Sequence, residues 1–130
     1  MKLLLLVFIA VLSVLLEAKM QNVTVNGVAV CGKKRLENAT VELWERDTFD
    51  PNDLLASVQV NKDGEFTVTG GEDEVGSIEP FIRITHKCNV KEGCTRQTDF
   101  VVPKDRINAA PYEMTYVTLD IVHADDKEKC

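Results

Sequence analysis

The stretch "LASVQVNKDGEFTVTG", residues 55–70, holds two runs in which apolar and polar residues alternate, with a tight turn between them. Alternation with a period of two puts one side-chain face of each run into a core, as in a half-buried β-strand. The turn Asn61-Lys62-Asp63-Gly64 ends on a glycine, which supplies the positive φ that a short hairpin loop needs. The stretch therefore predicts two strands joined as a β-hairpin.

Outward from this stretch, the chain continues as short β-branched runs separated by turn residues, and no segment has a long helical period. We predict strands at residues 23–31, 39–46, 55–60, 65–70, 80–88, 95–103 and 116–124. Residues 70–74 are predicted to form a polar loop. A short helix is expected within residues 104–113, where Pro111 limits its length. These elements are typical of an all-β sandwich or barrel.

The N-terminal segment carries one positive charge, Lys2, followed by an apolar run from Leu3 to Leu16. This is the layout of a secretory signal peptide, and Ala18 offers the small residue before the cleavage point. The run is shorter than the roughly 20 residues that a membrane-spanning helix needs. We therefore predict a signal peptide over residues 1–18 and one secreted, extracellular domain over residues 19–130, with an uncleaved anchor as the alternative.

The formal net charge of the chain is −6 at neutral pH. Non-specific nucleic-acid binding needs basic surface that displaces counterions, so we expect no nucleic-acid partner. Two N-glycosylation sequons, beginning at Asn22 and Asn38, agree with secretion and predict a glycoprotein.

An even number of cysteines in a secreted chain predicts two disulfides, and the spacing leaves all three pairings open. The four are Cys31, Cys88, Cys94 and Cys130. The stretch "ITHKCNVKEGCTR", residues 84–96, also places His86 next to two of them, which raises the alternatives of a zinc site or a catalytic thiol. A zinc site would need a fourth ligand, and a nucleophilic thiol would have to stay reduced beside a base. Secretion disfavours both, so we expect no metal or catalytic residue, and His86 is predicted to be a packed or capped histidine at a strand end.

Four further stretches form a combined signature: "VNGVAVCGKK", "VELWERD", "DLLASVQVNKDGEFTVTGGEDEVGSIEPFIRITHKC" and "CTRQTDFVVPKD". Together they resemble the nematode transthyretin-like proteins, and the resemblance covers residues 23 to about 122. It implies a transthyretin-like (prealbumin-like), seven-stranded antiparallel β-sandwich in an extracellular protein. It does not imply hormone transport, because these proteins share the fold of transthyretin without its ligand-lining residues.

The resemblance also implies a disulfide pairing. In that topology the first and last strands are parallel neighbours, with Cys31 ending the first and Cys130 following the last. The fifth and sixth strands are joined by the loop that holds Cys88 and Cys94. The implied pairs are Cys31–Cys130 and Cys88–Cys94. All four cysteines would lie near one pole of the sandwich, so the other pairings, and a bond from Cys130 to another chain, stay open.

The sequence contains no motif that predicts an enzyme or a cofactor. The transthyretin fold also hosts 5-hydroxyisourate hydrolases, which end in Tyr-Arg-Gly-Ser, whereas this chain ends in "DDKEKC". No G-x-S-x-G, phosphate-binding loop or H-E-x-x-H sequence is present. The acidic run Glu72-Asp73-Glu74 lacks the spaced ligands of a calcium loop, so we expect a solvated loop there rather than a weak calcium site.

What remains is binding. Basic residues follow Cys31 and flank the Cys88–Cys94 loop, so the implied topology gathers them at one pole: Lys33, Lys34, Arg35, Lys87, Lys91 and Arg96. We predict a secreted binding or adaptor protein that uses this basic end to contact an anionic lipid headgroup, a glycan or an extracellular protein. The alternative is a carrier that holds a small apolar ligand in a groove between sheets or subunits.

Overall fold

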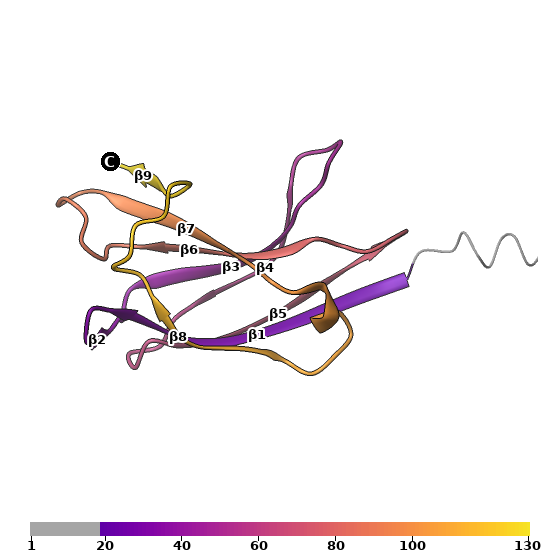
Figure 1. Cartoon of the computed structure of the whole chain (residues 1–130), viewed down its shortest axis with the longest axis horizontal. Coiled ribbons are helices and arrows are strands. Elements are labelled where there is room, and N and C mark those ends of the chain that lie inside the picture. The colour runs from indigo at the N-terminus through magenta and orange to yellow at the C-terminus, as the bar shows by residue number, and fades with distance from the viewer. Residues whose placement is uncertain (1–18) are drawn as a thin grey trace, which may run out of the picture.

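The computed structural model describes residues 19–130, and the predicted signal peptide lies outside the described residues. The described chain forms two β-sheets packed face to face, with one 3-10 turn (Figure 1). In chain order the elements are β1 (Lys19–Cys31), β2 (Lys34–Arg35), β3 (Ala39–Glu45), β4 (Asp53–Gln59), β5 (Glu65–Glu74), β6 (Pro80–His86), β7 (Thr95–Val101), η1 (Lys104–Arg106), β8 (Tyr112–Thr118) and β9 (Lys127–Lys129). The predicted all-β sandwich is confirmed, and η1 is the short helix expected within residues 104–113.

The first sheet has the order β2-β1-β5, with β8 also pairing with β1, and the second has the order β4-β3-β6-β7-β9. The β1–β8 pair is parallel and the other pairs are antiparallel. The parallel pairing implied for the first strand and the last predicted strand is therefore confirmed. No helix among residues 19–130 is long and apolar enough to cross a bilayer.

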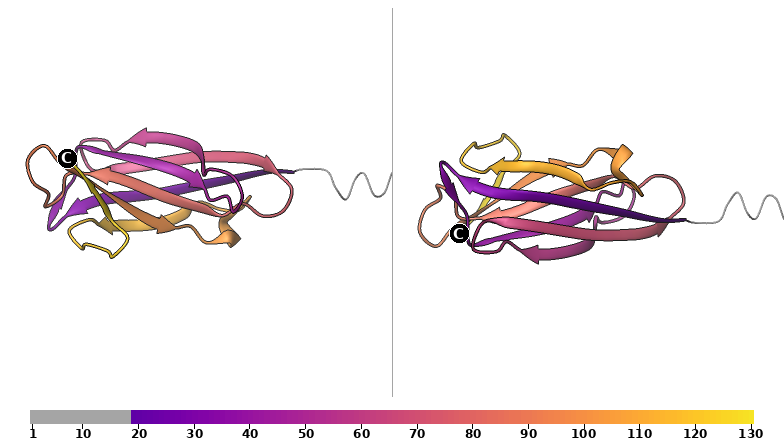
Figure 2. Two further views of the ribbon diagram at one scale, coloured as in Figure 1. Left: turned by 90° about the horizontal axis from the view of Figure 1, so that it is seen from above. Right: turned by 90° about the horizontal axis from the view of Figure 1, so that it is seen from below.

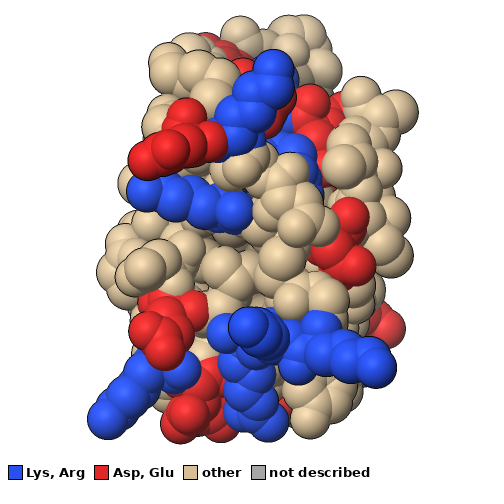
Figure 3. Space-filling model, turned by 90° about the vertical axis from the view of Figure 1, so that its left-hand side faces the viewer, with Lys and Arg blue, Asp and Glu red and all other residues tan. Residues whose placement is uncertain are grey.

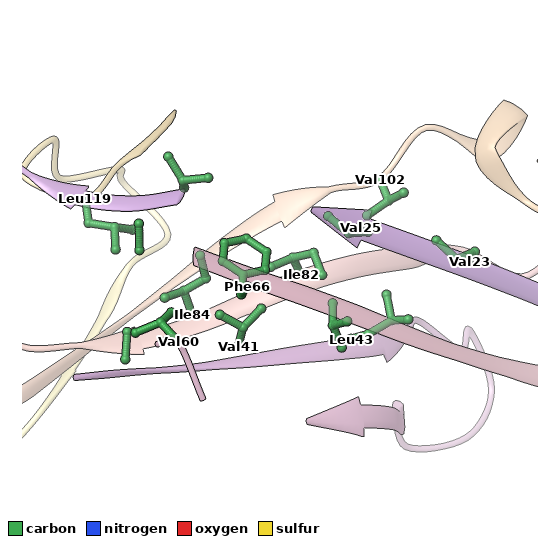
Figure 4. Close-up of a cluster of buried hydrophobic side chains, with 14 of the residues drawn as sticks. Val23, Val25, Val41, Leu43, Val60, Phe66, Ile82, Ile84, Val102 and Leu119 are labelled. Atoms are coloured by element: carbon green, nitrogen blue, oxygen red, sulfur yellow. The ribbon is translucent and has the colours of Figure 1, made fainter. Parts of the chain in front are cut away.

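The core lies between the two sheets and consists of the inward-facing members of each alternating run. Figure 4 shows side chains of β1 and β5 facing those of β3 and β6. The fully buried apolar residues include Val25, Val41, Leu43, Val68, Ile82, Ile84 and Leu119. Burial of a side chain of this size contributes about 1.5–3 kcal/mol of transfer free energy.

The turn at residues 61–64 forms as predicted, but it joins the two sheets instead of closing a hairpin. Gly64 has a φ of +75°, and its N–H donates to the carbonyl of Asn61 over 2.9 Å. The flanking strands do not pair: β4 pairs with β3, and β5 pairs with β1. Glycine is required for a second reason, because a Cβ at Gly64 would lie 2.6 Å from the carbonyl oxygen of Ala29. The predicted turn is therefore confirmed, whereas the predicted pairing of the two flanking strands with each other is wrong.

Residues 70–74 belong to β5 rather than to the predicted polar loop. They pair with the start of β1, from Val23 opposite Gly70 to Lys19 opposite Glu74. Two glycines and three acidic residues carry a loop signal locally, but pairing with a distant strand overrides local propensity.

The last predicted strand, at residues 116–124, begins and ends earlier than expected, because β8 runs from Tyr112 to Thr118. Val117 and Leu119 form an inward-facing apolar stripe and are buried, whereas Ile121 is 56% exposed. The apolar stripe therefore stops before His123, which lies outside any strand. Beyond β8 the chain crosses to the second sheet, where β9 pairs with β7, and this crossing was not predicted.

The sandwich has two chemically different ends. Figure 2 shows the β6–β7 loop, β2 and the C-terminus together at one end, which we call the disulfide pole (residues 31–35, 87–94 and 127–130). The end of β3, the end of β5 and η1 lie at the other end, which we call the far pole (residues 45–53, 72–80 and 102–108).

Candidate functional site at the disulfide pole

Two disulfides close the disulfide pole, and their pairing differs from the one implied by the resemblance. Cys31 is bonded to Cys88, with their Cα atoms 5.6 Å apart, and Cys94 to Cys130, with Cα atoms 4.0 Å apart. No free cysteine is present in the described part of the chain. The implied Cys31–Cys130 and Cys88–Cys94 bonds are therefore wrong.

The reason for the difference is the path of the C-terminal segment. The implied pairing assumed that this segment stays beside the end of β1. Instead β9 adds to the edge of β7, with Lys129 opposite Thr95, which brings Cys130 next to Cys94. Cys31 at the end of β1 then meets Cys88, two residues past the end of β6. The Cys31–Cys88 bond therefore joins the end of β1 to the β6–β7 loop, and the Cys94–Cys130 bond joins the residue before β7 to the residue after β9.

His86 lies under the pole as a packed, fully hydrogen-bonded side chain, as the sequence predicted. It is 1% exposed. Its Nδ1 accepts the N–H of Cys88 over 3.1 Å, and its Nε2 lies 3.1 Å from Oγ1 of Thr98. Because Nδ1 is an acceptor, the ring is neutral with its proton on Nε2. Burial, followed by the nearby positive charge of Arg96, lowers the pKa of His86 to about 4, against a smaller opposing effect of Asp126.

This shift predicts acid sensitivity. The folded-state pKa lies below the ordinary value of 6.5, so the unfolded chain binds a proton more readily between these two values. The stabilisation from neutral His86 is complete above pH 6.5 and is lost as the pH falls through about 4. The loss amounts to about 3 kcal/mol.

The measurement is urea unfolding at neutral pH and at pH 4, for the natural chain and for His86→Asn. Asparagine keeps an acceptor for the Cys88 N–H but does not titrate, so its loss on acidification should be smaller by that amount. Equal losses in the two proteins would show that His86 does not control this response.

Arg96 does not belong to the basic surface to which the sequence assigned it. Its side chain is 6% exposed, and its Nε lies 3.3 Å from Oδ2 of Asp126, whose side chain is 3% exposed. Its guanidinium also donates to the carbonyl of Leu119. The alternation of side chains along β7 indicates that Arg96 is buried, because Arg96 and Thr98 share the inward face of this strand. Arg96 is therefore a structural residue that ties β7 to the C-terminal segment.

The other predicted cations do lie on the pole and are exposed: Lys33, Lys34, Arg35, Lys87 and Lys91. None of them forms an ion pair within the described residues, where four such pairs occur elsewhere. Arg35 is the most constrained, because it donates to the carbonyl of Asp63 over 3.3 Å and lies over the ring of Tyr116.

Two further cations were missed by sequence reasoning. Lys127 and Lys129 of β9 are exposed at the same pole, because the C-terminal segment pairs with β7 there. Figure 3 shows this face with Lys and Arg in two groups, each accompanied by Asp and Glu side chains. The face is therefore basic in patches and not uniformly positive.

The predicted glycosylation sites lie on accessible positions. Asn38 is exposed in the turn before β3, and Asn22 is exposed within β1. The backbone N–H of Asn22 donates to Oδ1 of Asn108 over 2.8 Å. Glycosylation of both stays a prediction.

The fold and its two bonds define a disulfide-bonded β-sandwich protein. The sequence profile described as "Transthyretin-like family" matches residues 26–103. Transthyretin-like protein 16 of Caenorhabditis elegans is 54% identical over 114 residues, which cover 87% of this chain and 86% of that protein. Transthyretin-like protein 46 of the same organism is 31% identical over 130 residues, covering 93% and 72%. The chain belongs to the transthyretin-like family, as the sequence signature predicted.

A solved structure adds a likeness of fold alone. The 9R-lipoxygenase from Cyanothece superposes with a TM-score of 0.51 at 18% identity, over 77% of this chain. The aligned part is 17% of the lipoxygenase chain, so the likeness concerns one sandwich within a much longer protein.

Proposed function

We propose that this protein is secreted and acts as an extracellular binding protein, with the disulfide pole as its contact surface for an anionic partner. The observation that carries the proposal is the set of exposed cations on this pole that lack an ion-pair partner among the described residues. Lys33 comes from the β1–β2 turn, Lys34 from β2, Lys87 and Lys91 from the β6–β7 loop, and β9 contributes two more.

The two disulfides support this role because they restrict the segments that carry the cations. The Cys31–Cys88 bond joins the β1–β2 turn to the β6–β7 loop, and the Cys94–Cys130 bond joins that loop to β9. Ordering flexible loops opposes binding, so loops that are already held in place lose less entropy on contact. Loops on a rigid sandwich are also where binding surfaces commonly lie.

The chemistry of the pole favours phosphate, sulfate or carboxylate groups displayed on a surface. Lysine ammonium groups act as point charges without demanding one geometry. Each such cation near an anionic membrane contributes about 1 kcal/mol, and salt weakens the attraction within a Debye length. A lipid surface and a sulfated glycan offer the same chemistry, and the experiment separates them.

The test compares two charge reversals that change the net charge equally. One variant carries Lys33→Glu and Lys34→Glu at the disulfide pole, and the control carries Arg46→Glu and Lys104→Glu at the far pole. Binding is measured to phosphatidylglycerol vesicles and to immobilised heparin, at low and at physiological salt. Loss of two cations should weaken binding by about 30-fold, and the reversal by more, whereas the control should bind nearly as the natural chain does.

Binding to vesicles alone would assign a lipid surface, and binding to heparin alone a glycan. The proposal fails if neither probe binds the natural chain at low salt. It also fails if the two variants bind equally well.

The described residues give less support to the alternative of a carrier for a small apolar ligand. A hollow with a mainly apolar lining, at Pro80, Phe81, Val101 and Val102, holds only about 150 Å³, below the ~300–1,000 Å³ of drug-sized ligand pockets. The space between the sheets is filled by buried side chains. Surface hollows of about 330 and 360 Å³ are lined mainly by polar residues such as Asn26, Glu113, Gln21 and Asn108. Ligand pockets for apolar compounds are instead lined mostly by apolar side chains.

A further inference from the structure

Five carboxylates converge at the far pole, away from the surface discussed above. Glu45 ends β3, Asp47 follows it, and Asp53 begins β4. Carboxylate oxygens of these three lie within 4.8 Å of one another, and those of Glu45, Glu72 and Glu74 do so as well. Glu45 belongs to both groups, so its carboxylate is the centre of the cluster.

Glu45 also provides an independent indication that something is bound there. It is 3% exposed, because it continues the inward face of β3 after Val41 and Leu43. Its Oε2 is buried and has no hydrogen-bond partner. A carboxylate taken out of water without a donor or a cation is strongly unfavourable, so a group of this kind is expected to have a partner.

No cation of the described chain fills that role. The four ion pairs among residues 19–130 involve none of the five carboxylates. Arg46 is adjacent in sequence to Glu45, but its guanidinium lies over the ring of Phe81, 5.2 Å from the ring centre.

We infer that the cluster of Glu45, Asp47, Asp53, Glu72 and Glu74 binds a calcium ion. Calcium takes six to eight oxygen ligands at about 2.3–2.6 Å, so oxygens on opposite sides of the ion are about 5 Å apart. The oxygens within each group of three are no farther apart than 4.8 Å, and Glu45 belongs to both groups. Calcium also accepts irregular geometry, whereas magnesium demands a near-ideal octahedron. Asp53 is exposed, so the cluster has an open side through which an ion and its remaining water ligands can enter.

The local backbone holds the ligands in place. Glu45 and Asp53 are cross-strand neighbours in the β3–β4 pair. The N–H of Asp47 donates to Oδ1 of Asn52 over 3.1 Å, which fixes the loop between the two strands. Glu72 and Glu74 are two residues apart on β5 and therefore share a face, whereas Asp73 lies on the opposite, exposed face.

This arrangement explains why the contiguous run Glu72-Asp73-Glu74 pointed to a solvated loop. Only the first and third members of this run, Glu72 and Glu74, reach the cluster. The other ligands come from the β3–β4 hairpin. The competing way to satisfy the buried oxygen is a proton shared between carboxylates, since burial, followed by the neighbouring carboxyl groups of Glu72 and Glu74, raises the pKa of Glu45 to about 8.

The experiment titrates the full chain, expressed through a secretory host and stripped with chelator, with calcium chloride at neutral pH. Isothermal calorimetry gives the affinity, and the melting temperature gives the linked stability. Terbium supplies a third readout through emission sensitised by Trp44, the single tryptophan and the neighbour of Glu45. Glu45→Gln and Glu72→Gln test the site, and Asp73→Asn is the matched control, since it removes a charge from the same run on the face that points away.

We expect a dissociation constant of about 10⁻⁴–10⁻³ M, the range of extracellular calcium modules. A tenfold excess over this value should raise the melting temperature by about 5 °C. Both glutamine variants should bind at least tenfold more weakly, and Asp73→Asn should bind as the natural chain does. The inference is overturned if calcium gives neither heat nor a shift in melting temperature, which is the outcome for a shared proton, or if Glu45→Gln binds as tightly as Asp73→Asn. An equal response to magnesium would overturn the assignment to calcium.

Discussion

Replacing Cys31 and Cys88 together by alanine is expected to lower the free energy of unfolding by about 4 kcal/mol. The bond spans 57 residues, and in the loop-entropy account the constraint on the unfolded chain grows with the length of the closed loop. A domain of this size has a net stability of about 5–15 kcal/mol, so much of it would be lost. Cys88 is 2% exposed, and alanine therefore suits its surroundings better than serine.

Urea unfolding followed by Trp44 fluorescence measures this loss. The natural chain under reducing conditions is the second arm, and it should unfold at lower urea than the double variant, because it lacks both bonds. A double variant within 1 kcal/mol of the natural chain would show that the Cys31–Cys88 bond is not a major source of stability.

Substitution Arg96→Met is expected to cost about 3–5 kcal/mol, because it leaves Asp126 as a buried charge without its partner. The carbonyl of Leu119 also loses a donor. The effect should be visible as a lowered urea midpoint and a lowered melting temperature. Adding Asp126→Leu should recover part of the loss, since removal of both charges leaves no unpaired ion.

The matched control is Arg83→Met. Arg83 lies on the neighbouring strand β6 and pairs with Asp99, with its Nε 3.0 Å from Oδ1, but the two side chains are 21% and 27% exposed. More exposed pairs contribute about 0–1 kcal/mol, so this change should cost several-fold less. Equal costs for the two substitutions would show that burial of the Arg96–Asp126 pair does not determine its importance.

The fold could be predicted where the signal is local. Alternation identified the runs that became β3, β4, β6 and β7, and Gly64 identified the turn between β4 and β5. Which strand pairs with which could not be read from alternation, since β4 and β5 follow each other in the chain and still join different sheets. Only the family signature supplied the parallel pairing of the first strand with the last predicted one.

In the candidate site, too, the features with a local signal could be predicted and those that depend on long-range pairing could not. The exposed positions of Lys33, Lys34 and Lys91 follow from their place between predicted strands. The disulfide pairing was wrong because it depends on the path of residues 119–130, where the short strand β9 has no apolar alternation to reveal it. Arg96 was misplaced because charge was weighted above strand alternation.

The acidic cluster was beyond prediction for a different reason. Its members come from three strand ends and one loop, and they meet only because the end of β5 lies beside the β3–β4 hairpin. Glu45 continues an inward-facing stripe, and this is the one feature in the sequence that marks it as buried.

The proposed contact surface depends on two bonds that fix the loops and β9 at one pole of the sandwich. Tryptic mapping of the oxidised, deglycosylated protein without reduction tests this most directly, because trypsin cleaves after Lys87 and Lys91 and so separates all four cysteines. We expect the peptide of residues 20–33 to be joined to that of residues 88–91, and residues 92–96 to be joined to the peptide ending in Cys130. A bond between Cys31 and Cys130, or free thiols at these positions, would contradict this pairing.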